Sequence, residues 1–271
     1  MLPLLPRDSK QLEWIQEHAR ALNLAAAAGE APPPENPWAK KLGPLGPVAV
    51  LLIKGKAFLA AIFKLKFLLS FAAFIGVYWQ LFGAAFGIGF AMLILIHEMG
   101  HFIDIKRRGL PAEMPVFLPG LGAYVEWKAL GVSLETRAAV SLAGPLAGAF
   151  AAIACAVVWW QTGNPLWVAL ARAGAWLNIL NLIPVWMLDG GQAALALSKT
   201  HRFILLTACV GLWIISGENV FFLVALGALW RIFTKDLPPK PSPVTIAYFL
   251  AVLATLAIVV STMPGQGFGP S

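Results

Sequence analysis

Long apolar runs, separated by short polar connections, dominate the chain from residue 67 onward. A helix needs about 20 mostly apolar residues to cross a bilayer, with a lower limit of about 17. The pattern predicts the clearest spans at residues 67–82, 84–105, 138–160, 165–186 and 244–261. Two shorter runs, at residues 203–215 and 220–233, predict either two thin spans or a broken pair. We therefore expect an all-α polytopic membrane protein with about five to seven transmembrane helices.

The chain before residue 67 has a different pattern. Residues 1–46 form a polar arm that ends in a proline-rich linker, and we expect a solvated cytosolic extension. Residues 47–66 are apolar but contain lysines, which cost about 2.5–3.5 kcal/mol each near the centre of a span. This segment predicts an interfacial amphipathic helix that could run into the first span. The rest divides into a membrane core at 67–197 and C-terminal transmembrane helices with a short tail at 198–271.

The composition supports this class and limits the partners. Hydrophobic residues make up 59% of the chain and charged residues 12%, whereas about a quarter of a soluble domain is charged. The net charge of +7 does not indicate a nucleic-acid partner, because the basic residues lie between apolar runs rather than along one face. With the predicted spans, almost all of them fall on one side of the membrane. The positive-inside rule then places the N-terminus in the cytosol and the C-terminus outside. Arg172, inside an apolar run, is the exception.

Two histidines lie four residues apart inside the second predicted span, in the sequence His97-Glu98-Met99-Gly100-His101. Residues at this spacing share one face of a helix, so the two imidazoles can bind one zinc ion. Glu98 would lie beside the ion without binding it and act as general base toward the attacking water. The alternative is a polar cluster that packs helices together, but ionisable residues inside a bilayer are costly and mostly functional.

Zinc in a hydrolytic site commonly has three protein ligands and a fourth position open to water. Three candidates for the third ligand are poorly placed. His18 is in the polar arm, and His201 lies beside basic residues at a membrane edge. Asp104 lies close to Lys106 and Arg107, which favours an ion pair or a contact to His101 over metal binding.

Asp189 is the remaining candidate. Pro184 breaks the preceding helix, so Asp189 can turn inward from a non-helical segment. Gly190 and Gly191 permit close approach of the backbone or a positive φ. The predicted topology puts this segment on the same side as the end of the second span. We therefore expect Asp189 to bind the ion, and a simple turn at a helix end is the alternative.

The two motifs together resemble those of the site-2 protease family, the intramembrane zinc metalloproteases. His97, Glu98 and His101 match its HExxH motif. A later motif, N-x-x-P-x-x-x-x-D-G, is matched by Asn181, Pro184, Asp189 and Gly190. The resemblance implies one zinc ion per chain bound by His97, His101 and Asp189, with Glu98 as the catalytic base. It also implies that Asn181 is a catalytic residue that helps to bind the substrate or the oxyanion.

Two further stretches are similar to the same family. Gly144-Pro145 and Gly148 resemble a Gly-Pro segment in which the family often has an asparagine at the last position. Small residues at this spacing let helices approach closely, and we expect a packing role. Residues 118–127 resemble the family's re-entrant β-loop. Glycine-rich turns beside aromatic residues there predict a short hairpin. The substrate-binding residues would be Gly122, Ala123, Tyr124 and Val125. An interfacial loop anchored by Tyr124 and Trp127 is the alternative.

The expected function is metal-assisted hydrolysis of peptide bonds in transmembrane substrates, within or next to the bilayer. The expected location is the cell membrane of a prokaryote, with the active site toward the cytoplasm. A zinc-binding transporter or scaffold without proteolytic activity is the alternative, although a structural zinc site would need a fourth protein ligand. The substrate, the trigger for cleavage and the oligomeric state are left open.

Overall fold

The computed structural model describes residues 55–120, 122–127 and 131–265, with side chains from residue 65 onward. The chain divides into two units, Met1–Ala61 and Ile62–Ser271. Only residues 55–61 of the first unit are described, and they form the start of one helix. The predicted arm at 1–46 and the first part of the predicted interfacial helix lie outside the described residues.

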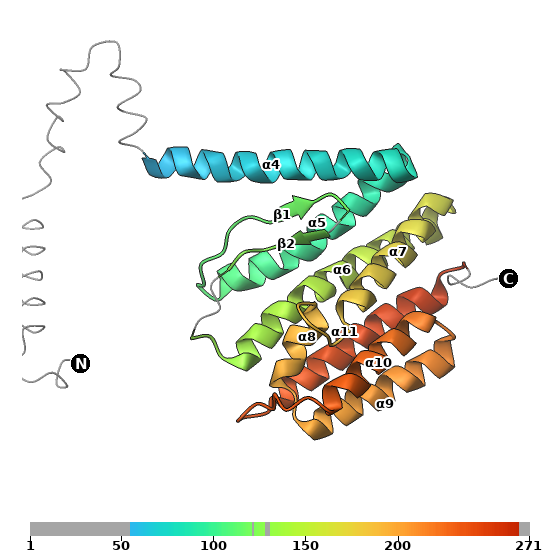
Figure 1. The fold of residues 1–271 in the computed structure, drawn as a ribbon. Helices are drawn as coiled ribbons and strands as arrows, with labels where there is room; N and C mark the ends of the chain where they lie inside the picture. Colours follow the sequence, from blue (N-terminus) through green and yellow to red (C-terminus); the bar gives the residue numbers. More distant parts are fainter. Residues whose placement is uncertain (1–54, 121, 128–130, 266–271) are drawn as a thin grey trace, which may run out of the picture. The chain divides into compact units, whose positions relative to one another are not determined.

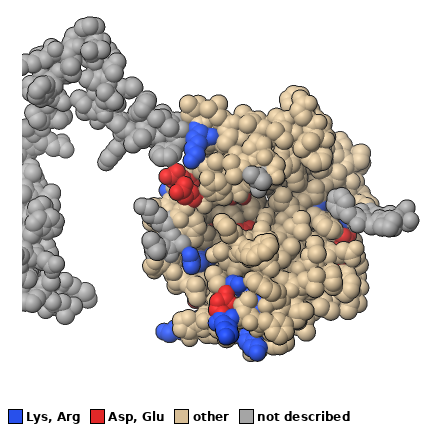
Figure 2. Space-filling view, viewed as in Figure 1, with Lys and Arg blue, Asp and Glu red and all other residues tan. Residues whose placement is uncertain are grey.

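The described part is mostly helical (Figure 1). Its elements, in chain order, are α4 (Gly55–Phe82), α5 (Ala84–Arg107), β1 (Val116–Leu118), β2 (Gly122–Tyr124), α6 (Leu134–Thr162), α7 (Pro165–Asn181), α8 (Asp189–Ala193), the 3₁₀ helix η2 (Ala194–Ala196), α9 (Lys199–Ser216), α10 (Asn219–Ile232) and α11 (Pro243–Thr262). Among the described residues, four segments are long and apolar enough to cross a membrane: Leu65–Phe82 in α4, and the whole of α5, α6 and α11. Charged side chains gather at a few places on the face in Figure 2. These features agree with the predicted class of polytopic membrane protein.

Two helices differ most in extent from the predicted segments. The fourth predicted span extended to residue 186, with a break in the helix at Pro184, and α7 ends slightly before that proline, at Asn181. Pro184 lacks an N–H group and disfavours helix for the residue before it, so the chain leaves the helix early. With 17 residues, α7 is shorter than the four candidate spans. At the other end, α4 runs without a break from Gly55 to Phe82, so the described part of the predicted interfacial helix joins the first span.

Helix α6 lies at the centre of the packing, in contact with α5, α7, α8 and α11. Many of its buried residues are small, among them Ala138, Gly144, Ala149 and Ala152. Small side chains allow the neighbouring helix backbones to approach closely. A tight reversal then leads into α7: Gly163 ends α6 in the left-handed conformation, and the Asn164 side chain caps α7. The chain thus places α7 directly alongside α6.

Arg172, the basic residue inside an apolar run, is paired. Its guanidinium donates to the carbonyls of Val260 and Met263, at 2.8 and 2.9 Å, and to Glu218 Oε1 at 2.8 Å. A buried cation needs such partners in an apolar environment. Arg172 therefore ties α7 to the start of α10 and the end of α11.

A two-stranded hairpin lies between α5 and α6 in the chain. Strands β1 and β2 are antiparallel, and Phe117 lies opposite Ala123. The buried ring of Phe117 packs against Phe71 and Phe74 of α4, at centroid distances of 4.8 and 5.3 Å. An aromatic residue of β1, which the sequence pattern did not single out, thus fixes the hairpin to α4.

Candidate active site

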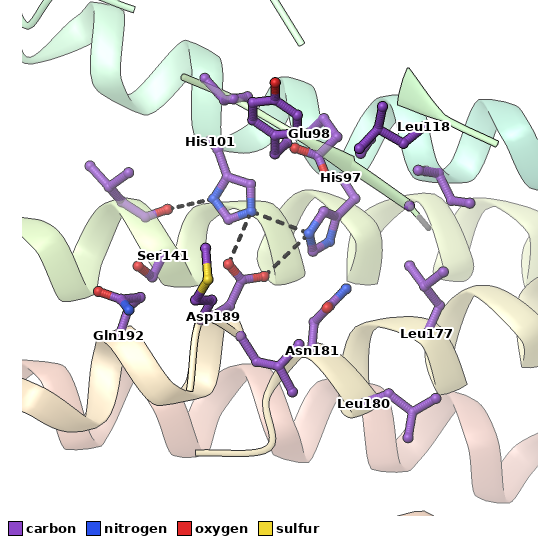
Figure 3. A pocket seen from close by; sticks show the side chains of 18 of the residues that line it. His97, Glu98, His101, Leu118, Ser141, Leu177, Leu180, Asn181, Asp189 and Gln192 are labelled. Carbon is purple, nitrogen blue, oxygen red and sulfur yellow. Dashed lines mark hydrogen bonds and ion pairs between the residues drawn. The ribbon is translucent and has the colours of Figure 1, made fainter. Parts of the chain in front are cut away.

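The three predicted metal ligands meet in the structure. His97 and His101 lie on one face of α5 and are buried, and Asp189 is the first residue of α8. His97 Nε2 lies 3.2 Å from Asp189 Oδ2, and His101 Nε2 lies 3.3 Å from Asp189 Oδ1. The two Nε2 atoms are 3.2 Å apart. Figure 3 shows the three side chains pointing toward one another. Asp189 was expected on a non-helical segment, but it opens a short helix after the irregular residues 182–188.

These distances fit a single zinc ion. Zinc binds histidine nitrogen and carboxylate oxygen at about 2.0–2.2 Å, so two ligands at tetrahedral angles lie about 3.3 Å apart. The three separations of 3.2, 3.2 and 3.3 Å match one face of such a tetrahedron. Together the three residues form a group that could hold a metal ion.

The protonation of the two imidazoles supports the same conclusion. His101 Nδ1 lies 2.8 Å from the Val140 carbonyl, which can only accept, so this nitrogen carries a proton. His97 Nδ1 lies 2.8 Å from Asn178 Oδ1, and the amide of Asn178 donates its Nδ2–H to Gly174 O at 2.7 Å. In neutral imidazoles both Nε2 atoms are then acceptors. They face a carboxylate, so three acceptors converge on one point, an arrangement that a bound cation stabilises.

Glycines make room for the site. A Cβ atom on Gly144 would lie 2.2 Å from His101 Nε2, and one on Gly148 would lie 2.1 Å from Asn178 Oδ1. The close approach expected of these small residues is confirmed, and the space admits the polar side chains of the site. A Cβ on Gly190 would lie 2.0 Å from the Leu182 carbonyl, and one on Gly191 would lie 2.5 Å from the Val185 carbonyl. The two glycines thus permit close backbone approach, whereas neither has a positive φ.

Glu98 and the ligands lie at the wall of a cavity of about 940 Å³. Glu98 is 6% exposed and follows the first ligand on α5. Asn181, the last residue of α7, lines the same cavity. Apolar side chains cover other parts of the wall, including Ile94, Leu177 and Leu180. A carboxylate, a metal-binding cluster and an amide therefore share one largely apolar space.

The predicted substrate-binding residues also line this cavity, from Gly122 to Val125. Val125 lies just beyond the end of β2. The Phe117 N–H donates to Ser70 Oγ of α4, at 3.3 Å, rather than to β2. Phe117 and Ala123 therefore form a non-hydrogen-bonded pair, in which both backbones direct their N–H and C=O groups away from the partner strand. The Ala123 amide is directed to the outer edge of β2, and the Tyr124 amide toward β1.

The part of the chain that contains this site is similar to known proteins. Residues 85–164, which include both histidines and Glu98, match the model of peptidase family M50. The resemblance to the site-2 proteases is confirmed. The Arabidopsis thaliana protein described as "Probable zinc metalloprotease EGY1, chloroplastic" is 34% identical over 62 residues, or 21% of this chain. The matched part is 11% of that relative's length.

Within this site-2 protease-like core, the other candidate ligands lie outside the metal-binding group. Asp104 pairs with Arg108 at 2.7 Å and with Arg107 at 3.6 Å. The predicted ion pair is therefore present, and neither Asp104 nor His201 belongs to the metal-binding group. Cys155 and Cys209 are buried and free.

The sequence did not predict two contacts of the site. Asn178 accepts a hydrogen bond from His97. The sequence indicates this role only by an amide side chain within an apolar run, one helical turn before Asn181. Arg231 of α10 donates to the carbonyl of Gly191, two residues after the third ligand, at 3.2 Å. No local pattern indicates that contact, because the two residues are 40 positions apart.

Proposed function

We propose that this chain is an intramembrane zinc metalloprotease that hydrolyses peptide bonds of transmembrane proteins within or next to the bilayer. The observation that carries the proposal is the tetrahedral spacing of His97, His101 and Asp189 beside the buried carboxylate of Glu98. Two findings support it: the match to a peptidase family and the name of the Arabidopsis relative.

Each residue of the site has a role in the proposed reaction. His97, His101 and Asp189 would hold zinc, which when bound polarises a carbonyl and acidifies water toward a pKa of about 7. Glu98 takes a proton from the attacking water and passes it to the leaving amine. The Asn181 amide donates a hydrogen bond to the developing oxyanion. Burial of Glu98 keeps its proton transfers away from bulk water.

The proposed handling of the substrate uses the edge of β2. A helical substrate hides its carbonyls in hydrogen bonds, so it must unwind before water can attack. The outward amide and carbonyl of Ala123 can pair with an extended segment by strand addition. The apolar cavity wall suits the side chains of a transmembrane segment.

We also propose the predicted topology, with about five to seven spans, a cytosolic N-terminus and a hairpin that re-enters the membrane. Water would then reach the site from the cytoplasm of a prokaryotic cell. A zinc-binding transporter or scaffold is the weaker candidate. The metal-binding group among the described residues offers three ligands, whereas a structural zinc site is closed by four.

The test uses the purified full chain and a model single-span protein. We expect cleavage within the apolar segment, its loss after zinc is removed with a chelator, and recovery after zinc is added back. Mass spectrometry of the products locates the cut. A zinc-loaded protein that leaves the model substrate and a panel of other single-span proteins intact would contradict the proposal.

A further inference from the structure

Asn178 occupies an unusual position between the candidate site and the helix core. It lies on α7, is 1% exposed, and reaches across to α5. Its Oδ1 accepts a hydrogen bond from His97 Nδ1 at 2.8 Å, and its Nδ2 donates to the Gly174 carbonyl at 2.7 Å. The second bond fixes which end of the amide faces the histidine. Asn178 therefore presents an acceptor to His97 in one orientation.

The neighbouring helix leaves room for this amide. A Cβ atom on Gly148 of α6 would lie 2.1 Å from Oδ1 and 2.2 Å from Nδ2 of Asn178. Real Cβ atoms do not approach so closely, so any larger residue at 148 would displace the amide. Glycine at 148 and asparagine at 178 form a matched pair across the contact between α6 and α7.

The two histidines are held in different ways. The backbone carbonyl of Val140 fixes His101, so no substitution can remove that acceptor. His97 depends on a side chain. Groups that bind the second nitrogen of a metal-binding histidine set its tautomer and ring orientation. His97 is thus the ligand whose direction a single side chain can change.

We propose that Asn178 is a positioning residue that directs His97 Nε2 toward the metal, and that Gly148 provides the space its amide needs. The inference rests on the proposed zinc site and deepens it. Asn178 touches neither the ion nor the substrate in this account. Its effect is on metal affinity, which can be measured whether or not the chain cleaves any given substrate.

The test measures zinc affinity of the purified full chain by competition with a chelator of known affinity. Asn178→Leu keeps the branched shape of the side chain but has no acceptor. We expect it to weaken zinc binding by about 10–100-fold, the usual effect of losing such a contact. Asn219→Leu is the matched control, because Asn219 is exposed at the start of α10. Its zinc affinity should equal that of the wild type.

A pair of double variants separates orientation from packing. Asn178→Gly with Gly148→Asn moves the amide onto α6, into the space that it fills in the wild type. We expect this variant to regain at least tenfold in zinc affinity over Asn178→Gly alone. Asn178→Gly with Gly148→Leu refills the space without an acceptor and should show no such gain. If Asn178→Leu does not fold, these double variants still show whether Asn178 acts by orienting His97 or by packing.

Two results would overturn the inference. One is an Asn178→Leu protein that folds and binds zinc as tightly as the wild type. The other is an equal gain with leucine and asparagine at 148, which would assign Asn178 a packing role only. A wild type that binds zinc tightly but cleaves nothing would instead contradict the proposed function and leave this inference standing.

Discussion

The metal-binding cluster (His97, His101, Asp189) and the arginine cluster (Arg202, Arg231, Asp236) both place ionisable side chains among apolar helices. In the first, when the imidazoles are neutral, the atoms that face one another are all acceptors, at 3.2 to 3.3 Å. In the second, Arg202 Nη1 and Nη2 and Arg231 Nη2 have acceptors beside them, whereas the buried Nε of each arginine has no hydrogen-bond partner among the described residues. Arg202, 1% exposed, donates to the carbonyls of Arg231 and Asp236, at 2.6 and 2.8 Å.

The two arginines of the arginine cluster share one carboxyl group. Arg231 pairs with Asp236 at 2.9 Å, and Arg202 lies 3.3 Å from the same carboxyl group. Burial raises the pKa of Asp236, but the hydrogen bond from Thr234 and the charges of both arginines outweigh it, so the pKa lies below its ordinary value. The carbonyls and the carboxyl group that face the arginines all belong to the fold, so we interpret this cluster as structural.

The difference shows how to distinguish a reactive buried cluster from a structural one. Burial and charge are common to both. The metal-binding cluster lacks a positive partner at its centre and borders a cavity, whereas the arginine cluster is closed by backbone carbonyls. Substitutions in the first should therefore change chemistry more than stability, and substitutions in the second should do the opposite.

The largest effect is expected at the metal ligands. His101→Ala and Asp189→Ala should each lose stoichiometric zinc and lower cleavage by about 10³-fold or more, because both metal and oxyanion stabilisation are lost. Metal analysis and cleavage of a single-span substrate are the measurements. Asp104→Ala is the control and should keep its zinc. Stoichiometric zinc in Asp189→Ala would mean that a different residue is the third ligand.

Arg202→Met should have the largest effect on stability. The carbonyls of Arg231 and Asp236 lose a charged donor, which costs about 1.5–3 kcal/mol for each such hydrogen bond, whereas the exposed carboxyl group of Asp236 adds little. Thermal unfolding in detergent is the measurement, with Lys199→Met as an exposed control on the same helix. Zinc bound per folded molecule should stay near one. Unchanged stability together with lost zinc would remove the distinction between the clusters.

Strand β2 lines the cavity outside both clusters, and substitutions there should affect substrate binding. Ala123→Pro removes the outward amide of β2, so it should lower cleavage of a helical substrate about tenfold without changing zinc content. Tyr124→Pro removes a bond within the hairpin instead and should lower stability. A substrate that already contains helix-breaking residues should be less affected by Ala123→Pro. Full activity of Ala123→Pro on the helical substrate would rule out strand addition.

Arg231 connects the two clusters, and its substitution should have a small effect on the metal. It donates to Asp236 and to the carbonyl of Gly191 behind the third ligand. Arg231→Met should lower stability and also weaken zinc binding about threefold to tenfold, because Asp189 loses support from α10. Chelator competition measures the second effect. Zinc affinity equal to that of Arg202→Met would show that the Gly191 contact does not act on the site.

The sequence predicted the parts of the site that depend on local spacing. Four residues of helix bring His97 and His101 together, and Pro184 ends α7 so that Asp189 can turn toward them. Hydropathy predicted the membrane class, because a bilayer leaves few alternatives to apolar helices. The hairpin was found from its glycine turns, although its anchor, Phe117, was not.

Contacts between distant segments could not be predicted in the same way. An apolar helix is buried on most faces, so periodicity does not show that Asn178 faces α5 and α6. The contact of Arg231 with Gly191 depends on how α10 packs beside α8. The exact start of α8 and end of α7 depend on the packing of Gly190 and Gly191 against the preceding turn.

The most direct test of the account is Glu98→Gln, with zinc content and turnover measured on the same sample. Glu98 is proposed as the base and not as a ligand, so zinc should stay near one per chain. Cleavage of the single-span substrate should fall about 10²–10⁴-fold, the usual loss with a general base. Substantial residual turnover with full zinc occupancy would contradict the central claim.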